Sequence, residues 1–175
     1  MKKVFLFVAF AAMCIAANAQ VLKTFECKLF SCQYPAEFEA QEQWMDEAFN
    51  AKIEDGVEFF SLSVTDQDMT VQQLKSCGEG MKGLVERSMG EPTGWKAGAL
   101  VVKGKTVMFR SEGEEEPAYD GVKVPAVRFS FCTVTPNKKT FCGELKFQKK
   151  DEAKYSQGGI RTSHEHDHEP AHRGP

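Results

Sequence analysis

Hydrophobic and polar side chains alternate along most of the chain between residues 20 and 155, a period-two pattern that is typical of β-strands with one buried face. The alternating runs cover residues 25–29, 30–34, 49–54, 57–65, 99–102, 106–110, 122–134 and 140–148. Because the connections between these runs are short, we expect antiparallel pairing to dominate. The alternation changes phase at Leu29-Phe30, which predicts a bulge or a turn there.

Turn-forming residues mark several of the connections. Asp55-Gly56 separates two strand-like runs and predicts a hairpin with a type I′ turn, in which both central residues have positive φ. Gly104 separates the runs at 99–102 and 106–110. The acidic segment 112–117 is typical of a solvated turn rather than a calcium loop, because its carboxylates lack the alternating ligand spacing.

Residues 70–89 carry the clearest helical pattern. Thr70 and Gln73 form a capping box, and Gly90 and Pro92 mark the end. Apolar residues recur within it at helical spacing, namely Val71, Leu74, Cys77, Met81, Leu84, Val85 and Met89. The sequence therefore predicts an α+β fold in which an antiparallel β-sheet is packed by one main amphipathic helix at 70–89. Residues 39–48 fit either a second short helix or a polar loop.

The last two strands, at 122–134 and 140–148, allow their register to be predicted. If odd-numbered residues of one strand pair with odd-numbered residues of the other, one set of apolar side chains shares a buried face. This set is Val127, Phe129, Phe131, Phe141, Leu145 and Phe147. With a tight loop at 136–138, Cys132 and Cys142 then lie directly opposite each other on the other face, which we expect to be the solvent face. We predict a structural disulfide between them, with two neighbouring free thiols as the alternative.

The first residues have the organisation of an export signal. Lys2 and Lys3 precede an apolar stretch at 4–15, and Ala17-Asn18-Ala19 fits a signal peptidase site, so residues 1–19 are predicted to be a signal peptide. We expect a mature protein that is periplasmic or secreted, with no later segment apolar enough to span a membrane. The mature chain has 20 basic and 25 acidic residues, and its basic residues occur only in short groups, which argues against nucleic-acid binding.

The mature chain keeps an odd number of cysteines, namely Cys27, Cys32, Cys77, Cys132 and Cys142. No CxxC spacing occurs among them, which argues against a zinc ribbon and a thioredoxin-type motif. Cys77 falls on the apolar face of the predicted helix, where a packed free thiol is the expected role. Cys27 and Cys32 can bond if the chain reverses between them; we favour an extended, unbonded arrangement.

All the histidines lie in a C-terminal segment at 156–175, which is rich in Gly, Pro and charge and is predicted to be a disordered tail after a single domain at 20–155. They are His164, His166, His168 and His172. Together with Glu165 and Asp167 they offer ligands for Zn, Cu or Ni. The body has no imidazole, so a Ser/His/Asp triad, a Cys/His pair and a histidine-ligated metal site are excluded within it.

One family resemblance is carried by the order of elements. A strand that ends in Tyr34-Pro35 and is followed by Phe38, then a hairpin, one amphipathic helix and several antiparallel strands resembles the PsbP-like and DcrB-like exported proteins. The resemblance covers about residues 25–155. It implies an α/β/α-type arrangement around an antiparallel sheet and an exported accessory role, and it transfers no functional residue. Phe38 stands where the family usually has Trp, and the cysteines and the histidine tail depart from the pattern.

Three functions are consistent with these patterns. The leading hypothesis is an exported, non-enzymatic accessory or interaction domain of the bacterial cell envelope, with an unidentified envelope protein as partner and no cofactor. The alternative is a metal-binding or metal-buffering protein that acts through its histidine-rich tail. An enzyme that uses carboxylates alone is third, and its candidate groups are Asp46, Glu47, Asp66 and Asp68.

Overall fold

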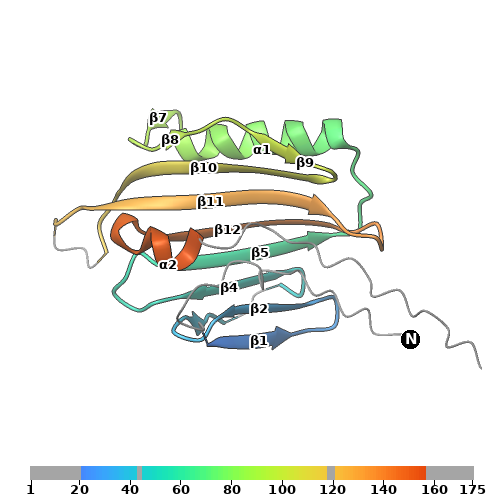
Figure 1. Ribbon diagram of the computed structural model, residues 1–175, viewed down its shortest axis with the longest axis horizontal. Coiled ribbons are helices and arrows are strands. Elements are labelled where there is room, and N and C mark those ends of the chain that lie inside the picture. Colours follow the sequence, from blue (N-terminus) through green and yellow to red (C-terminus); the bar gives the residue numbers. More distant parts are fainter. Residues whose placement is uncertain (1–20, 43–44, 118–120, 157–175) are drawn as a thin grey trace, which may run out of the picture.

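The computed structural model describes residues 21–42, 45–117 and 121–156, and its largest element is an eight-stranded antiparallel sheet (Figure 1). The strands of this sheet are β3 (Glu39–Ala40), β4 (Ala48–Lys52), β5 (Phe59–Thr65), β8 (Lys96–Ala97), β9 (Val101–Lys103), β10 (Thr106–Glu115), β11 (Val124–Val134) and β12 (Thr140–Gln148). They lie in the order β3-β4-β5-β12-β11-β10-β8, and β9 also pairs with β10. Each described strand pair is antiparallel, as the short connections predicted.

Two hairpins and two helices complete the described fold. The hairpins are β1 (Leu22–Glu26) with β2 (Ser31–Pro35), and β6 (Arg87–Ser88) with β7 (Glu91–Pro92). The helices are α1 (Val71–Glu86) and α2 (Glu152–Ser156), and a 3-10 turn at Lys149–Asp151 leads into α2. The predicted α+β class, with an antiparallel sheet and one main helix, is confirmed. The short second helix is α2. Of the two alternatives for residues 39–48, the helix is wrong because Glu39 and Ala40 pair with β4.

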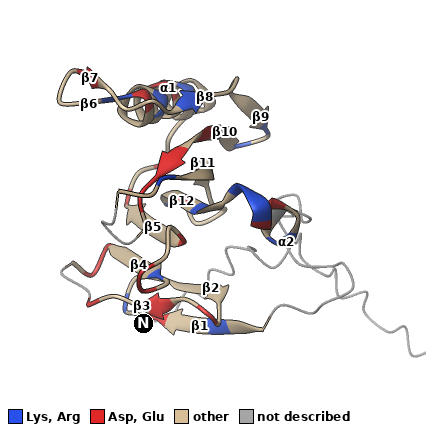
Figure 2. Ribbon diagram, turned by 90° about the vertical axis from the view of Figure 1, so that its left-hand side faces the viewer, with Lys and Arg blue, Asp and Glu red and all other residues tan. Residues whose placement is uncertain are grey.

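The two faces of the sheet are covered by different elements. The helix α1 packs on one face over β10 and β11, and α2 lies on the other side of the strands (Figure 2). The β1–β2 hairpin covers that second face together with α2. Both faces of the central strands are therefore buried, with one large hydrophobic cluster on the side of the β1–β2 hairpin and two smaller ones beneath α1.

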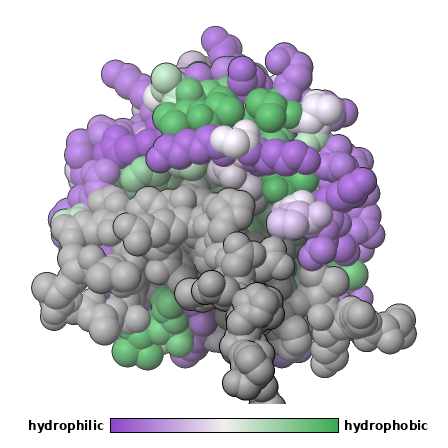
Figure 3. All heavy atoms as spheres, turned by 45° about the vertical axis from the view of Figure 1, so that its right-hand side comes forward, coloured by the Kyte–Doolittle hydropathy of each residue, from purple (hydrophilic) through white to green (hydrophobic). Residues whose placement is uncertain are grey.

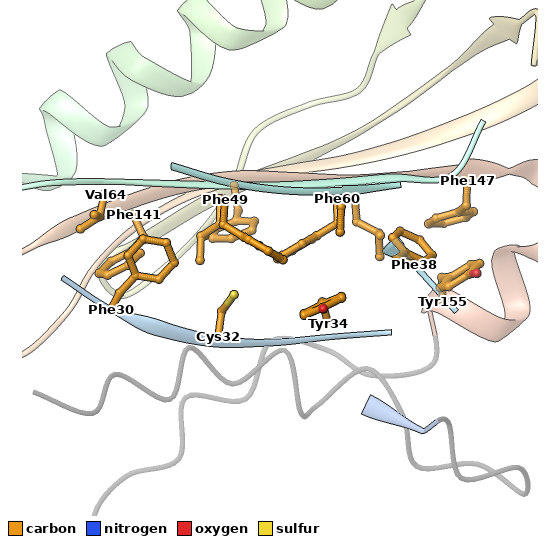
Figure 4. Close-up of a cluster of buried hydrophobic side chains, with 14 of the residues drawn as sticks. Phe30, Cys32, Tyr34, Phe38, Phe49, Phe60, Val64, Phe141, Phe147 and Tyr155 are labelled. Carbon is orange, nitrogen blue, oxygen red and sulfur yellow. The ribbon is translucent and has the colours of Figure 1, made fainter. Parts of the chain in front are cut away.

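Aromatic side chains fill the space between the β1–β2 hairpin and the sheet (Figure 4). Phe25 stacks on Phe49 with ring centroids 4.1 Å apart, and Phe147 stacks on Tyr155 of α2 at 4.7 Å. The largest fully buried side chains are mostly in this cluster, including Phe30, Phe38, Phe49, Phe60, Phe141 and Phe147. Since each buried aromatic ring removes about 150–250 Å² from water, this cluster is the main hydrophobic core.

The register predicted for the last two strands is confirmed. Cys132 of β11 lies opposite Cys142 of β12, and the predicted apolar partners on the other face belong to the aromatic core. The expectation that the two cysteines face solvent is wrong. Cys132 is only 1% exposed, because α1 covers this face of the sheet.

The helix α1 begins as predicted and ends earlier than predicted. Thr70 and Gln73 form a complete capping box. The helix ends at Glu86 rather than near residue 89, because Met89 and Gly90 both take positive φ (53° and 88°) and turn the chain into the β6–β7 hairpin. Leu84 and Met89 are consequently exposed, although the helical pattern had assigned them to the apolar face.

Two predicted chain reversals differ from the structure in detail. The phase change at Leu29-Phe30 belongs to a turn rather than a bulge, since β1 and β2 pair with each other and Cys27 N donates to Phe30 O at 3.0 Å. The extended geometry that we favoured there is therefore wrong, although Cys27 and Cys32 are free thiols, as the favoured unbonded state has them. The β4–β5 hairpin is present, but the type I′ turn is wrong, because Asp55 has a positive φ (56°) and Gly56 does not.

The acidic segment 112–117 is mostly strand. β10 continues to Glu115, so the predicted turn at 112–115 is wrong. Glu115 lies 3.0 Å from Lys146 Nζ and 3.7 Å from Arg128 Nη2. Cations on β11 and β12 thus compensate the carboxylate of Glu115, which favours its place at the end of β10.

The edge of the sheet beside β10 is formed partly by β9, which exposes Val101 and Val102. Hydrophobic side chains gather in the upper part of the face shown in Figure 3. Within the described ranges, no helix has the length and apolar character to cross a bilayer. The predicted signal peptide at 1–19 and the predicted tail from residue 157 onward lie outside the described residues.

Candidate metal centre

Three cysteine thiols meet between α1 and the sheet. Cys77 comes from α1, Cys132 from β11 and Cys142 from β12, and their Sγ atoms all lie within 4.8 Å of one another. Cys77 Sγ lies 3.3 Å from Cys132 Sγ and 3.9 Å from Cys142 Sγ. We call these three residues the thiol cluster.

The local structure around α1 explains the close approach of Cys77. Leu74, one turn earlier, is fully buried, which fixes this face of the helix against the sheet. Gly78 is the next residue along the same face. A Cβ atom at Gly78 would lie only 3.0 Å from Val107 Cγ1 and 3.1 Å from Leu100 Cδ2, so the absence of a side chain lets the helix approach β10.

A fourth sulfur atom lies at the edge of the thiol cluster. Met81 is four residues after Cys77 and therefore on the same side of α1. Its Sδ atom is 3.3 Å from Cys132 Sγ. Four sulfur atoms from two strands and one helix thus contact each other in a chain.

The surroundings of the thiol cluster are apolar. Cys132 is buried, whereas Cys77 and Cys142 are partly exposed. The hydrophobic side chains that form the same cluster are Met69, Leu74, Met81, Leu100, Val107 and Val134. A buried polar group without a partner also lies on this sheet face. Ser130, two residues before Cys132, is 1% exposed, and its Oγ atom has no hydrogen-bond partner among the described residues.

The three thiols do not ionise alike. The pKa of Cys142 is lowered, chiefly by a hydrogen bond from Cys132. Burial acts in the opposite direction, and a second hydrogen bond, from Cys77, lowers the pKa of Cys142 further. The pKa of Cys132 is raised, first by its hydrogen bond to Cys142 and then by burial. Burial is the main reason that the pKa of Cys77 is raised. The first proton to leave the cluster therefore produces a thiolate at Cys142, the form that binds metals.

The sequence indicated two of these three residues. The cross-strand position of Cys132 and Cys142 follows from strand parity, and Cys77 falls on the apolar face of its helix, where we expected a packed thiol. What the sequence did not show is that α1 covers the sheet face that carries the other two. The useful signal in the sequence was that Cys132 and Cys142 share the sheet face opposite the aromatic core. If that face is also buried, another element must pack on it, and in the structure this element is α1.

Each described cysteine is a free thiol in the structure, including Cys132 and Cys142. The predicted disulfide is thus not formed in it, and the bond stays a prediction about the oxidised protein. Cys27 and Cys32 are also free, in the β1–β2 hairpin. Burial, assisted by the nearby Cys27, raises the pKa of Cys32 to about 12, so this thiol is unreactive near neutral pH.

The other candidate groups from the sequence lie apart from the thiol cluster or outside the described residues. Asp66 pairs with Lys139 at 2.9 Å, and Asp68 pairs with Lys105 at 3.3 Å, so both act as ion-pair partners near the end of β5. The four histidines predicted to bind metal, His164, His166, His168 and His172, are outside the described residues, and their role stays a prediction.

Comparison with known proteins gives one structural similarity to report. No protein-family model matches the chain, and no curated protein matches it. Among solved structures, the chain is similar to the Ran-binding protein Mog1p of Saccharomyces cerevisiae, with a TM-score of 0.47 and 12% sequence identity. The match covers 78% of this chain and 82% of that chain.

Proposed function

We propose that this chain is an exported, non-enzymatic accessory protein of the cell envelope that binds one soft metal ion through Cys77, Cys132 and Cys142. The observation that carries the proposal is the meeting of three Sγ atoms within 4.8 Å, from three separate elements. The export of the protein rests on the signal-peptide pattern at residues 1–19. The resemblance to PsbP-like and DcrB-like proteins supports the same setting.

The spacing of the sulfur atoms suits a metal ion. Zinc–sulfur bonds of about 2.3 Å place two thiolates of a tetrahedral site about 3.8 Å apart, and a trigonal site with equal bonds places them about 4.0 Å apart. The distances from Cys77 Sγ to the two other sulfur atoms are 3.3 and 3.9 Å. The third pair, Cys132 and Cys142, has its Sγ atoms within 4.8 Å. Side-chain movements of up to about 1 Å would therefore bring the three thiolates around one ion.

The chemistry of the donors favours a soft ion. Thiolates bind Cu(I) and Zn(II) in preference to Mg²⁺ or Ca²⁺, which prefer oxygen ligands. The low pKa of Cys142 relative to its two neighbours supplies the first thiolate. Metal binding then displaces the remaining protons, and apolar side chains line the site around the buried Cys132.

The test measures how much metal the purified mature chain retains after dialysis against a weak chelator under reducing conditions. We expect about one ion per chain at the thiol cluster, lost on the replacement of Cys77, Cys132 and Cys142 by Ser. The matched control is the double variant C27S/C32S, which alters two cysteines outside the cluster and should retain the ion. Circular dichroism of each variant establishes that it is folded.

A second variant separates this site from the alternative function, metal buffering by the tail. Replacement of the four histidines by Ala keeps the full chain and removes the imidazoles of His164, His166, His168 and His172. Retention of the tightly bound ion in this variant supports the thiol cluster. Loss of that ion here, with retention in the triple cysteine variant, would identify the tail as the metal site and contradict our proposal.

A further inference from the structure

The thiol cluster and its nearest neighbour offer only sulfur to an ion. Its three cysteines are the one group of at least three Cys, His, Asp or Glu side chains in the described ranges whose ligand atoms come close enough to hold a metal. The next donor is the Met81 thioether, 3.3 Å from Cys132 Sγ. Thiolates are soft ligands for both monovalent copper and zinc, but a thioether suits copper and is not among the usual zinc ligands.

Zinc would lack a ligand in this arrangement. A structural zinc site has four ligands drawn from Cys, His, Asp and Glu, and thioethers are not among them. The thiol cluster supplies three. The fourth position would have to be taken by water on the partly exposed side of Cys77 and Cys142, because Met81 occupies the side next to the buried Cys132.

Copper(I) has no such requirement. It accepts low coordination numbers and a thioether ligand, so two or three thiolates with Met81 complete its surroundings. The placement of Met81 follows from the helix, because residues four apart lie on the same side. Met81 and Cys77 therefore approach the strand cysteines from α1 as a pair.

From these contacts we propose that the ion bound by Cys77, Cys132 and Cys142 is monovalent copper, with the Met81 thioether as an additional ligand. This inference rests on the metal-binding function proposed above and specifies the ion. It assigns Met81 a role that a purely packing side chain would not have, namely discrimination between copper and zinc.

The test uses the full mature chain with its four tail histidines replaced by Ala, so that only the thiol cluster binds tightly. Cu(I) is titrated without oxygen in competition with bathocuproine disulfonate, and Zn(II) is titrated separately against a chromophoric chelator. We expect one Cu(I) per chain with near-ultraviolet thiolate-to-copper absorption. Cu(I) should also displace bound Zn(II).

Methionine variants then test the additional ligand. The loss of a group that only supports a metal ligand costs about 10–100-fold in affinity, so M81L should weaken Cu(I) binding by at least about 10-fold while Zn(II) affinity stays unchanged. Met69 packs against the same hydrophobic cluster, which makes M69L the matched control. M69L should change neither affinity.

The outcomes are distinguishable. If Zn(II) is bound and Cu(I) does not displace it, or if M81L affects both ions or neither, the copper inference is overturned while the metal-binding function stands. If neither ion binds to the folded chain, the proposed function itself fails. Cu(I) selectivity that M81L reduces and M69L does not would support the inference.

Discussion

The Sγ atoms of Cys77 and Cys132 lie 3.3 Å apart, although 55 residues separate the two cysteines in the sequence. One is in the helix that covers the sheet and the other in a central strand, so the contact exists only when α1 has docked. The state of these thiols, reduced, metal-bound or oxidised, therefore reports directly on the packing of the helix against the sheet.

The first prediction concerns oxidation. In the metal-free chain under mild oxidant we expect the disulfide between Cys132 and Cys142, because strand pairing fixes them opposite each other and their Sγ atoms are within 4.8 Å. Mass spectrometry of the non-reduced, proteolysed protein should yield one linked peptide. Recovery of Cys132 and Cys142 in separate peptides would contradict the bond. If bound metal prevents the oxidation of these two thiols, the result would connect the disulfide to the proposed metal site.

The second prediction concerns Ser130. Its buried Oγ has no hydrogen-bond partner among the described residues, so S130A should leave the metal-free chain equally stable or more stable by about 1 kcal/mol. Urea unfolding of the metal-free chain measures this effect. A variant that destabilises the metal-free chain would contradict this account.

The third prediction concerns Glu37, which anchors α2. Lys154 Nζ lies 2.6 and 2.7 Å from its two carboxylate oxygens, and the Tyr155 hydroxyl donates to the same group. Burial favours the neutral acid, but the hydrogen bonds from Lys154 and Tyr155 outweigh it and lower the pKa of Glu37 from its ordinary value of 4.5. The ionised carboxylate thus stabilises the folded state.

The pH dependence of this contribution follows from the lowered pKa. The stabilisation is fully present above pH 4.5 and is lost as the pH falls through the lower pKa of the folded protein. We expect E37Q to cost no more than about 1 kcal/mol at pH 7, because Glu37 is exposed and solvent screens its ion pair, and we expect the difference from the unmodified chain to shrink in acid. Urea denaturation from pH 7 to 3 measures this, with E39Q, on an exposed residue, as control. A difference that is constant across this range would contradict the prediction.

The fourth prediction compares two glycines. A Cβ atom at Gly143 would lie 2.6 Å from the Ser61 carbonyl oxygen and 2.9 Å from Phe131 Cζ, so G143A should destabilise the protein by about 1–3 kcal/mol or more. Gly80 lies within α1 and faces open space, so G80A should stabilise it by about 0.5–1 kcal/mol. Thermal unfolding of the two variants should shift in opposite directions. If the unfolding temperatures of the two variants shifted equally, Gly143 would tolerate a side chain, which requires β5 to move away.

The local patterns of the sequence determined most of the elements. The capping box at Thr70 and Gln73, the β4–β5 hairpin and the register of the last two strands all follow from interactions between residues near in sequence or paired across a short loop. Turn details were less predictable, because the conformation of Asp55-Gly56 depends on a loop closed by Ile53 and Glu58 (N–O 3.1 Å). The helix end depended likewise on the β6–β7 hairpin.

The candidate site was decided by tertiary structure. Strand parity alone placed Cys132 and Cys142 on one face, and helical periodicity alone placed Cys77 on an apolar face. Neither pattern states which sheet face the helix covers. The β1–β2 hairpin packs on the aromatic face, so the helix packs on the other face, and this choice depends on contacts between elements far apart in the sequence. Docking of α1 on the cysteine-bearing face converts a predicted surface pair into a partly buried cluster of three thiols, with Met81 beside it.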